Sequence, residues 1–260
     1  MTALTSETFG SDAYSFGVDV GGSGIKGAVV DLSTGEFVGE RMKVTTPQPA
    51  TPQAVAAVIA EVVQRAEWAG PVGVALPSVI KGRSALTAAN IDQEWIGTNV
   101  YELLRTNLGD RDYAVLNDAD AAGLAEVAFG DPQTRQGSVV FLTFGTGIGS
   151  ALLVDGTLFP NTELGHMVIG GREAEHFASS AVREREDLSY KVWASRVSTV
   201  IKEYERLLNP TAFVVGGGIS RKADKWVPLL EVNADVFPAR LRNRAGIVGA
   251  AMAARDHVNP

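Results

Sequence analysis

The chain has 260 residues, of which 45% are hydrophobic and 20% are charged, and it contains no cysteine. Such a composition is typical of a globular protein with a sizeable core, and it excludes disulfides, thiol catalysis and zinc sites built from thiolates. A formal net charge of −7 at pH 7 argues against broad binding to nucleic acids or anionic membranes, and the lack of a long apolar stretch or signal-peptide pattern predicts a cytoplasmic protein.

The first half of the chain predicts the element order βββαβαβ. Residues 1–13 are polar and without pattern, and we expect them to form a flexible leader. Three apolar runs separated by short turns predict a meander of strands over 16–20, 25–31 and 37–45. Apolar residues at helical spacing predict a helix from Pro52 to about Trp68. Two buried strands with a helix between them follow, over 72–76, 99–108 and 113–116.

The second half repeats this theme. A helix is predicted from Asp118 to Phe129, and from Ser138 a second meander begins. The remaining predicted elements are a long helix, a strand and a last helix, over 188–208, 212–215 and 245–255. We therefore expect a small N-terminal α/β domain over 14–117 and a large C-terminal α/β domain over 118–244. The helix of about 245–260 is expected to pack back on the first domain.

One short phrase occurs twice in the chain. The run Gly22–Val30 recurs at Gly145–Leu153 with Gly, Ile and Ala in register, and both copies lie between apolar runs. Each copy predicts a β-hairpin with a glycine turn, whose backbone N–H groups and hydroxyl could bind a phosphate. A single turn of this kind is more often only a tight turn, whereas the repeat favours one phosphate chain held between two similar halves. The pattern is not a Walker A loop, because Lys26 is followed by Gly27 and a strand.

Four motifs, taken in order, make the chain similar to the ROK sugar kinases, and within them to the polyphosphate glucokinases. The resemblance covers nearly the whole chain from Tyr14 onward, and its motifs are Asp19-Val20-Gly21-Gly22-Ser23-Gly24, Asn117-Asp118, Gly145-Thr146-Gly147-Ile148-Gly149 and Glu163-Leu164-Gly165-His166. It implies a duplicated actin/hexokinase-type (ribonuclease H-like) α/β fold, with two α/β domains around a cleft. The two glycine hairpins are then the phosphate-binding elements, made by Gly21, Gly22, Ser23, Gly24, Lys26, Gly145, Thr146 and Gly147.

The resemblance also implies the catalytic groups. Asp118 becomes the general base that takes the proton of a sugar hydroxyl, although on position alone an aspartate here would serve as a helix N-cap. Asp19 becomes the carboxylate that orients a hydrated Mg²⁺ on the donor phosphates, with a turn residue at a strand end as the alternative. Lys26 either meets the incoming phosphates or is a solvated strand residue.

The sugar is expected to be bound by residues that read hydroxyl groups. A carboxylate and an imidazole three residues apart, Glu163 and His166, can accept from and donate to adjacent hydroxyls. The resemblance adds further sugar contacts on the basis of motif position and register, namely Asn90, Asn117, Asp118 and Glu175. Most members of the family carry a zinc site of one His and three Cys, so the absence of cysteine predicts that no structural zinc is present. A metal held by His166, His176 and nearby carboxylates is the alternative.

The donor is expected to lie along a third glycine segment. Gly216, Gly217 and Gly218 follow a strand and resemble the nucleotide-side loop of the family, and Lys222 is assigned to the same side. Other basic residues could line a polyanion or be ordinary solvated charges: Lys81, Arg83, Arg172, Arg221 and Lys225.

Together these observations predict a phosphotransferase. It would move the terminal phosphoryl group of inorganic polyphosphate, and of ATP, to the 6-hydroxyl of glucose, with mannose as a second sugar and Mg²⁺ as cofactor, in a monomer or homodimer. The alternatives are an ATP-only glucokinase, a phosphohydrolase of the same fold and a non-catalytic, sugar-responsive ROK protein. A repressor is disfavoured, because about 13 residues before the first strand leave no room for a DNA-binding module.

Overall fold

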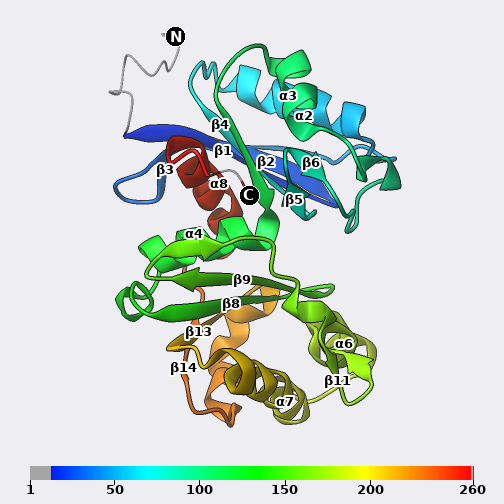
Figure 1. The fold of residues 1–260 in the computed structure, drawn as a ribbon, viewed down its shortest axis with the longest axis vertical. Coiled ribbons are helices and arrows are strands. Elements are labelled where there is room, and N and C mark those ends of the chain that lie inside the picture. The colour runs from blue at the N-terminus through cyan, green and yellow to red at the C-terminus, as the bar shows by residue number, and fades with distance from the viewer. Residues whose placement is uncertain (1–12, 259) are drawn as a thin grey trace. The chain divides into compact units, whose positions relative to one another are not determined.

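The computed structural model describes residues 13–258 and 260, which form two compact units. The first unit contains the described residues up to Ala125 and from Arg244 onward, and the second contains Glu126–Asn243. Each unit is built on one five-stranded sheet with helices packed on it (Figure 1). The predicted leader lies outside the described residues except for Ala13, whose carbonyl accepts a hydrogen bond of 2.8 Å from the Leu32 amide.

The first sheet contains the predicted meander and two parallel strands. Its order is β3-β2-β1-β4-β7, with β1 to β3 antiparallel and with β4 and β7 parallel to β1. The bounds are β1 Tyr14–Gly21, β2 Gly24–Asp31, β3 Glu36–Val44, β4 Val72–Leu76 and β7 Tyr113–Asn117. Helices α2 (Pro52–Arg65) and α3 (Val100–Leu108) pack on one face through a core that includes Phe16, Val18 and Val62.

Helix α2 shows how local sequence sets an element and how packing ends it. The Thr51 side chain caps the helix by accepting from the Ala54 amide at 3.4 Å, and Pro52 suits its first turn. The helix ends at Arg65, three residues before the predicted end at Trp68. Glu67 adopts a left-handed conformation with φ 51°, which turns the chain and lets Trp68 pack 6.4 Å from the Phe16 ring.

The second sheet repeats the order of the first. Its order is β10-β9-β8-β13-β14, again three antiparallel strands followed by two parallel ones. The bounds are β8 Ser138–Phe144, β9 Ile148–Val154, β10 Thr157–Phe159, β13 Ala212–Gly216 and β14 Asp235–Pro238. Helix α7 (Tyr190–Leu208) covers this sheet, and edge-on contacts at 4.9–5.8 Å join the rings of Phe144, Trp193 and Trp226 in its core. The sequence repeat is therefore a repeat of topology.

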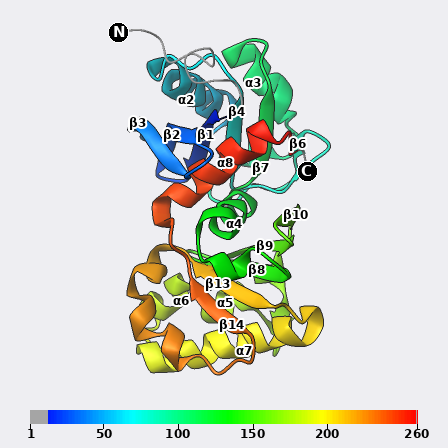
Figure 2. The ribbon, with the colours of Figure 1, turned by 90° about the vertical axis from the view of Figure 1, so that its left-hand side faces the viewer.

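Two helices lie where the chain passes from one unit to the other in the sequence. Helix α4 (Asp118–Phe129) begins in the first unit and continues into the second, whereas the predicted boundary was at its first residue. The C-terminal helix α8 (Ala245–Arg255) belongs to the first unit and crosses β1, β4 and β7 (Figure 2). Its backbone comes so close that a Cβ added to Gly17 or Gly73 would overlap the carbonyl of Ile247 or Ala250. Glycine in these two strands is required by that approach.

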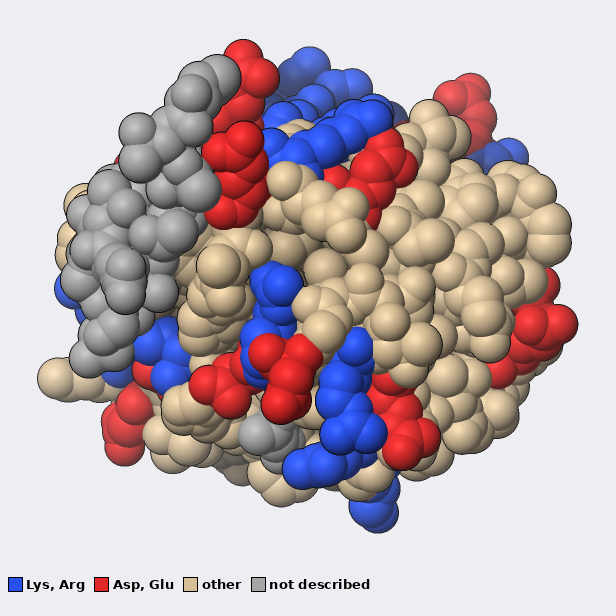
Figure 3. Space-filling view, turned by 90° about the horizontal axis from the view of Figure 1, so that it is seen from above, with Lys and Arg blue, Asp and Glu red and all other residues tan. Residues whose placement is uncertain are grey.

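Short elements fill the connections and were not predicted. The strands among them are β5 Ile80–Lys81, β6 Ser84–Ala85, β11 Val168–Ile169 and β12 Arg172–Glu173, and the helices are α5 Ala174–Ala178 and α6 Ser180–Arg185. The 3₁₀ turns are η1 Gln93–Trp95, η2 Pro132–Thr134, η3 Leu164–His166, η4 Gly218–Lys225, η5 Val227–Leu229 and η6 Arg242–Arg244. Over the described part of the chain, no helix combines the length and the apolar content that crossing a bilayer requires. On the face drawn in Figure 3, acidic and basic side chains lie interspersed, so no field of one sign forms there.

Candidate active site

The first glycine turn presents backbone donors. Gly21 pairs with Gly24 across the hairpin, which leaves Gly22 and Ser23 as an exposed two-residue loop. The Gly21 carbonyl accepts a hydrogen bond of 2.5 Å from Thr46 Oγ1, whereas the amides of Gly22 and Ser23 have no acceptor within the described residues. Two unpaired N–H groups at a tight turn suit an anion. The predicted contact of this turn with phosphate remains a prediction.

Asp19 lies beside this turn and is held from two sides. It is the cross-strand neighbour of Lys26, and Lys26 Nζ is 3.0 Å from Asp19 Oδ2. The start of α8 approaches it from the other side, because a Cβ added to Gly246 would lie 3.2 Å from Asp19 Cγ. A helix N-terminus favours a carboxylate. A single partly exposed carboxylate fits a Mg²⁺ ion that keeps most of its waters. The predicted contact of Lys26 with phosphate remains a prediction, since its partner in this structure is Asp19.

The structure separates the roles of Asn117 and Asp118. The Oδ1 atom of Asn117 caps α4 by accepting from the amides of Ala119 and Asp120 at 2.8 and 3.3 Å, and its Nδ2 donates to the Ser78 carbonyl at 3.3 Å. Asp118 is the first residue of α4 and is exposed, with Oδ1 accepting from the Ala119 amide at 2.9 Å. The capping role considered for Asp118 therefore belongs mainly to Asn117. A sugar contact of Asn117 would have to share a side chain that the backbone already uses.

Asn90 is placed at the first glycine turn. It is exposed and left-handed with φ 61°, and a Cβ added to Gly22 would lie 3.3–3.4 Å from its carbonyl oxygen and Cβ. Within the first unit, a predicted sugar residue and a predicted phosphate turn thus lie side by side.

The second glycine turn is tied to the element that follows it. The Gly145 amide donates to the Gly147 carbonyl at 3.0 Å, the Gly145 carbonyl accepts from the Ala181 amide at 3.1 Å, and Thr146 is exposed. Glu175 Oε2 accepts from the Ile148 amide at 3.3 Å and occupies the space where a Cβ on Gly147 would lie. Glycine at 147 therefore makes room for the Glu175 carboxylate.

The predicted sugar element forms the turn η3. A Cβ on Gly165 would overlap the Ile148 carbonyl, so the turn packs directly on strand β9. The buried Tyr204 hydroxyl donates to the Leu164 carbonyl at 2.7 Å from helix α7. These two contacts hold Glu163 and His166 on a fixed support, and the Glu163 carboxylate is not used as a helix cap.

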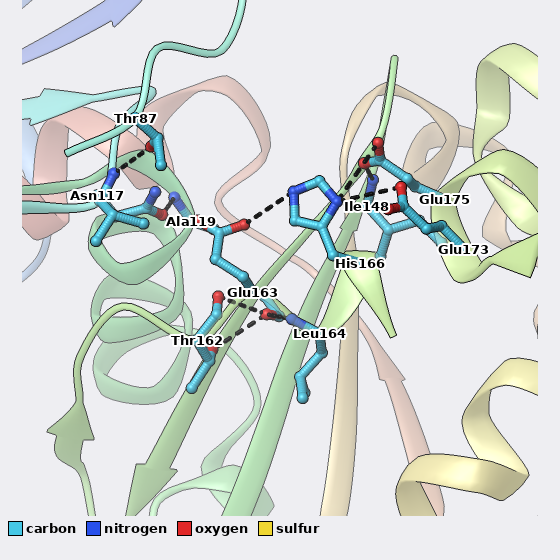
Figure 4. Close-up of polar contacts among 12 residues, drawn as sticks. Thr87, Asn117, Ala119, Ile148, Thr162, Glu163, Leu164, His166, Glu173 and Glu175 are labelled. Carbon is cyan, nitrogen blue, oxygen red and sulfur yellow. Dashed lines mark hydrogen bonds and ion pairs between the residues drawn. The ribbon is translucent and has the colours of Figure 1, made fainter. Parts of the chain in front are cut away.

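His166 is surrounded by three carboxylates (Figure 4). Its Nε2 is 3.8 Å from Glu163 Oε2, and its Nδ1 is 3.4 Å from Glu173 Oε2 and 4.0 Å from Glu175 Oε1. The same two oxygens of Glu173 and Glu175 lie 3.4 and 3.6 Å from the ring of His176. Sequence reasoning selected Glu163, His166 and Glu175 but not Glu173, whose only signal was its place two residues before Glu175. Ligand atoms of His166, Glu173 and Glu175 lie within 4.8 Å of one another, a spacing that could also hold a metal ion.

The third glycine segment lies against the second glycine turn. Gly217 has φ 87°, and a Cβ there would overlap the Phe144 carbonyl, so no other residue fits. Gly218 is exposed and opens onto free space, and Lys222 is exposed on η4. The other basic candidates are divided between the units: Lys81 and Arg83 lie in the first, and Arg172, Arg221 and Lys225 in the second.

The ROK family profile matches residues 15–179. The chain belongs to the ROK family. It is 56% identical over 251 residues to a polyphosphate glucokinase of Mycobacterium tuberculosis, a match that covers 96% of this chain and 95% of the relative. A polyphosphate glucokinase of Mycobacterium leprae is 49% identical over 259 residues, covering 99% of this chain and 80% of the relative.

Solved ROK structures have the same fold. The inorganic polyphosphate/ATP-glucomannokinase of Arthrobacter sp. strain KM matches with a TM-score of 0.87 and 45% identity, over 95% of this chain and 100% of that one. A ROK glucokinase of Streptomyces griseus, solved with glucose and AMPPNP, matches with a TM-score of 0.78 and 24% identity, over 94% and 99% of the two chains. The predicted actin/hexokinase-type α/β fold is confirmed for this ROK protein.

Proposed function

We propose that this ROK protein transfers the terminal phosphoryl group of inorganic polyphosphate, and of ATP, to the 6-hydroxyl of glucose, with mannose as a second sugar. The observation that carries the proposal is the 56% identity, over nearly the whole chain, to a polyphosphate glucokinase. The mannose assignment is supported by the 45% identity to a glucomannokinase. The unpaired amides of the first glycine turn and the carboxylates around His166 supply chemistry that suits phosphate and sugar.

In the proposed reaction, Glu163, His166 and Glu175 bind sugar hydroxyls and the glycine turns bind the donor phosphates. The 6-hydroxyl oxygen attacks the terminal phosphorus, and the bond from that phosphorus to the bridging oxygen breaks. The bridging oxygen leaves with the bonding electron pair on the shortened polyphosphate or on ADP, and the hydroxyl proton passes to Asp118. With a loose transition state the proton leaves late, so the position of Asp118 matters more than its basicity.

Asp19 is the residue that would hold Mg²⁺, through water. The ion would neutralise charge on the donor phosphates, which is the main requirement of phosphoryl transfer. The side chain of Asp19 would keep the hydrated ion oriented, and Lys26, 3.0 Å away, holds that carboxylate in place.

A coupled assay of hexose 6-phosphate formation tests the function. Glucose and mannose are each supplied with long-chain polyphosphate, with ATP or with no donor, in the presence and absence of Mg²⁺. We expect donor-dependent and Mg²⁺-dependent product with both donors. Use of ATP alone would reduce the protein to an ordinary glucokinase. Release of inorganic phosphate at the same rate with and without sugar would identify a phosphohydrolase instead.

As the pH is lowered, glucose binding is expected to weaken at a higher pH than protonation of an ordinary glutamate would produce. Burial raises the pKa of Glu163 above its usual 4.5, with His166 opposing and Glu175 adding to the increase. Because a raised pKa places protonation at a higher pH, Glu163 loses its charge, and with it an acceptor for sugar hydroxyls, before unshifted glutamates do. The measurement is the KM for glucose as the pH is lowered from about pH 8 into the ordinary glutamate range.

Two variants assign the pH effect. Glu163→Gln should show a high KM with a smaller rise over this range, whereas the neighbouring Glu173→Gln should keep the rise of the wild-type protein. A wild-type KM that stays constant down to the ordinary glutamate range would contradict the assignment of Glu163 to sugar binding.

A further inference from the structure

Two basic side chains of the second unit lie around the ring of Tyr190, and of these only Lys225 was among the basic residues considered from the sequence. The Arg183 guanidinium carbon, from α6, lies over the ring of Tyr190 at 4.1 Å from its centroid. Lys225 Nζ, at the end of η4, is 5.9 Å from the same centroid. Both distances are within the range of attraction between a cation and an aromatic face. Tyr190, the first residue of α7, therefore holds two positive charges near each other.

Neither of these charges is neutralised by a carboxylate within the described residues. Two other arginines of the same region, Arg185 and Arg196, both pair with Glu186, at 3.4 and 2.7 Å. Arg183 and Lys225 form no such ion pair, and Arg183 Nε is buried with no hydrogen-bond acceptor in the described chain. Two neighbouring cations without a counter-charge in the described chain suit an anion that is supplied from outside.

The position of the two cations relates them to the predicted donor segments. Helix α6 begins at the second glycine turn, where the Ala181 amide donates to the Gly145 carbonyl at 3.1 Å, two residues before Arg183. Turn η4 begins directly after Gly217 and ends at Lys225. Gly217 packs against the carbonyl of Phe144, the residue before the second glycine turn. The elements that carry both cations thus begin at the two glycine segments assigned to donor binding.

We propose that Arg183 and Lys225, arranged around Tyr190, bind phosphate groups of the donor chain beyond the end that reacts. The ligand class is a linear polyphosphate with groups remaining past those held at the glycine turns. A guanidinium binds two phosphate oxygens at once and an ammonium adds a point charge, and the ring limits the freedom of both before binding. An adenine ring is the less suitable occupant, because the Arg183 guanidinium already lies over a face of Tyr190. The inference rests on the proposed function, since it requires a polyphosphate donor.

Steady-state kinetics with matched variants test this site. Arg183→Met, Lys225→Met and the double variant are compared with Arg185→Met and Lys202→Met, whose side chains pair with Glu186 and Glu231. For long-chain polyphosphate at saturating glucose, we expect the KM to rise about fivefold for each single variant and about twentyfold or more for the double variant. The kcat, the KM for glucose and the KM for ATP should match those of the two controls. Thermal denaturation checks that Arg183→Met folds, and Lys225→Met alters only an exposed side chain.

Direct binding of long-chain polyphosphate without sugar gives a second readout. When a protein binds a polyanion, the logarithm of the dissociation constant increases linearly with the logarithm of the salt concentration. Each cation removed from the site should lower this slope by about one unit. A double variant with the slope and KM of the controls would overturn the site. A rise in the KM for ATP alone would identify a nucleotide-base site and overturn it as well. If the wild-type protein neither binds nor uses polyphosphate, the donor in the proposed function fails first, and this inference with it.

Discussion

Replacing Asp118 by asparagine is expected to lower kcat by about 10²- to 10⁴-fold while glucose still binds with unchanged affinity. The variant removes the group that takes the hydroxyl proton and keeps a side chain of the same shape. An asparagine oxygen can still accept from the Ala119 amide, and the cap of α4 is provided by Asn117. The measurements are kcat in the coupled assay and the dissociation constant of glucose by calorimetry.

Asp131→Asn is the matched control for this variant. Asp131 caps the short turn η2 and pairs with Arg240, and no catalytic role is assigned to it. It should leave kcat unchanged. A kcat of Asp118→Asn within a few-fold of this control would mean that another group accepts the proton.

Gly73→Ala is expected to give the largest loss of stability among the variants considered, about 1–3 kcal/mol or more. Strand β4 is buried throughout, and a Cβ at this position would overlap the Ala250 carbonyl of α8. Neither element can retreat without opening the core of the first unit. Urea denaturation followed by tryptophan fluorescence measures the effect, with the two units allowed separate transitions.

The control for this effect is an alanine in open space. Gly218 is exposed, and a Cβ there would meet nothing within 4 Å, so Gly218→Ala should leave the urea midpoint in place. Equal midpoints for the two alanine variants would show that α8 does not pack on β4 as closely as the structure describes.

Long elements with a clear apolar period were predicted well. The strands 72–76 and 113–116 and the helices ending at Leu108, Leu208 and Arg255 were found within one or two residues of their observed bounds. The early end of α2 at Arg65 was not predicted, because a left-handed Glu67 and the packing of Trp68 on Phe16 decide it. Elements of a few residues, such as α5 and β11, carry no period that could be read.

In the candidate site, too, some features could be predicted from the sequence and others could not. The residue types of the sugar element and the glycine turns were available from motif order, as was the assignment of Asp118. Three contacts could not be predicted from the motifs, because each depends on a partner that the fold brings close. Asn117 caps α4, Lys26 pairs with Asp19, and Glu173 faces His166. Arg183 and Tyr190 had no motif to mark them.

By itself, the sequence determined that the chain is duplicated and which residue types are assigned to phosphate and sugar, because periodicity and motif order are local properties. The repeated glycine phrase predicts two hairpins, and both sheets contain one in the same topological position. Only the tertiary structure decided which backbone amides are left unpaired and which charges are neutralised. Those outcomes depend on contacts between segments far apart in the chain, such as Thr46 with Gly21 and Lys225 with Tyr190, and no local pattern of residues encodes them.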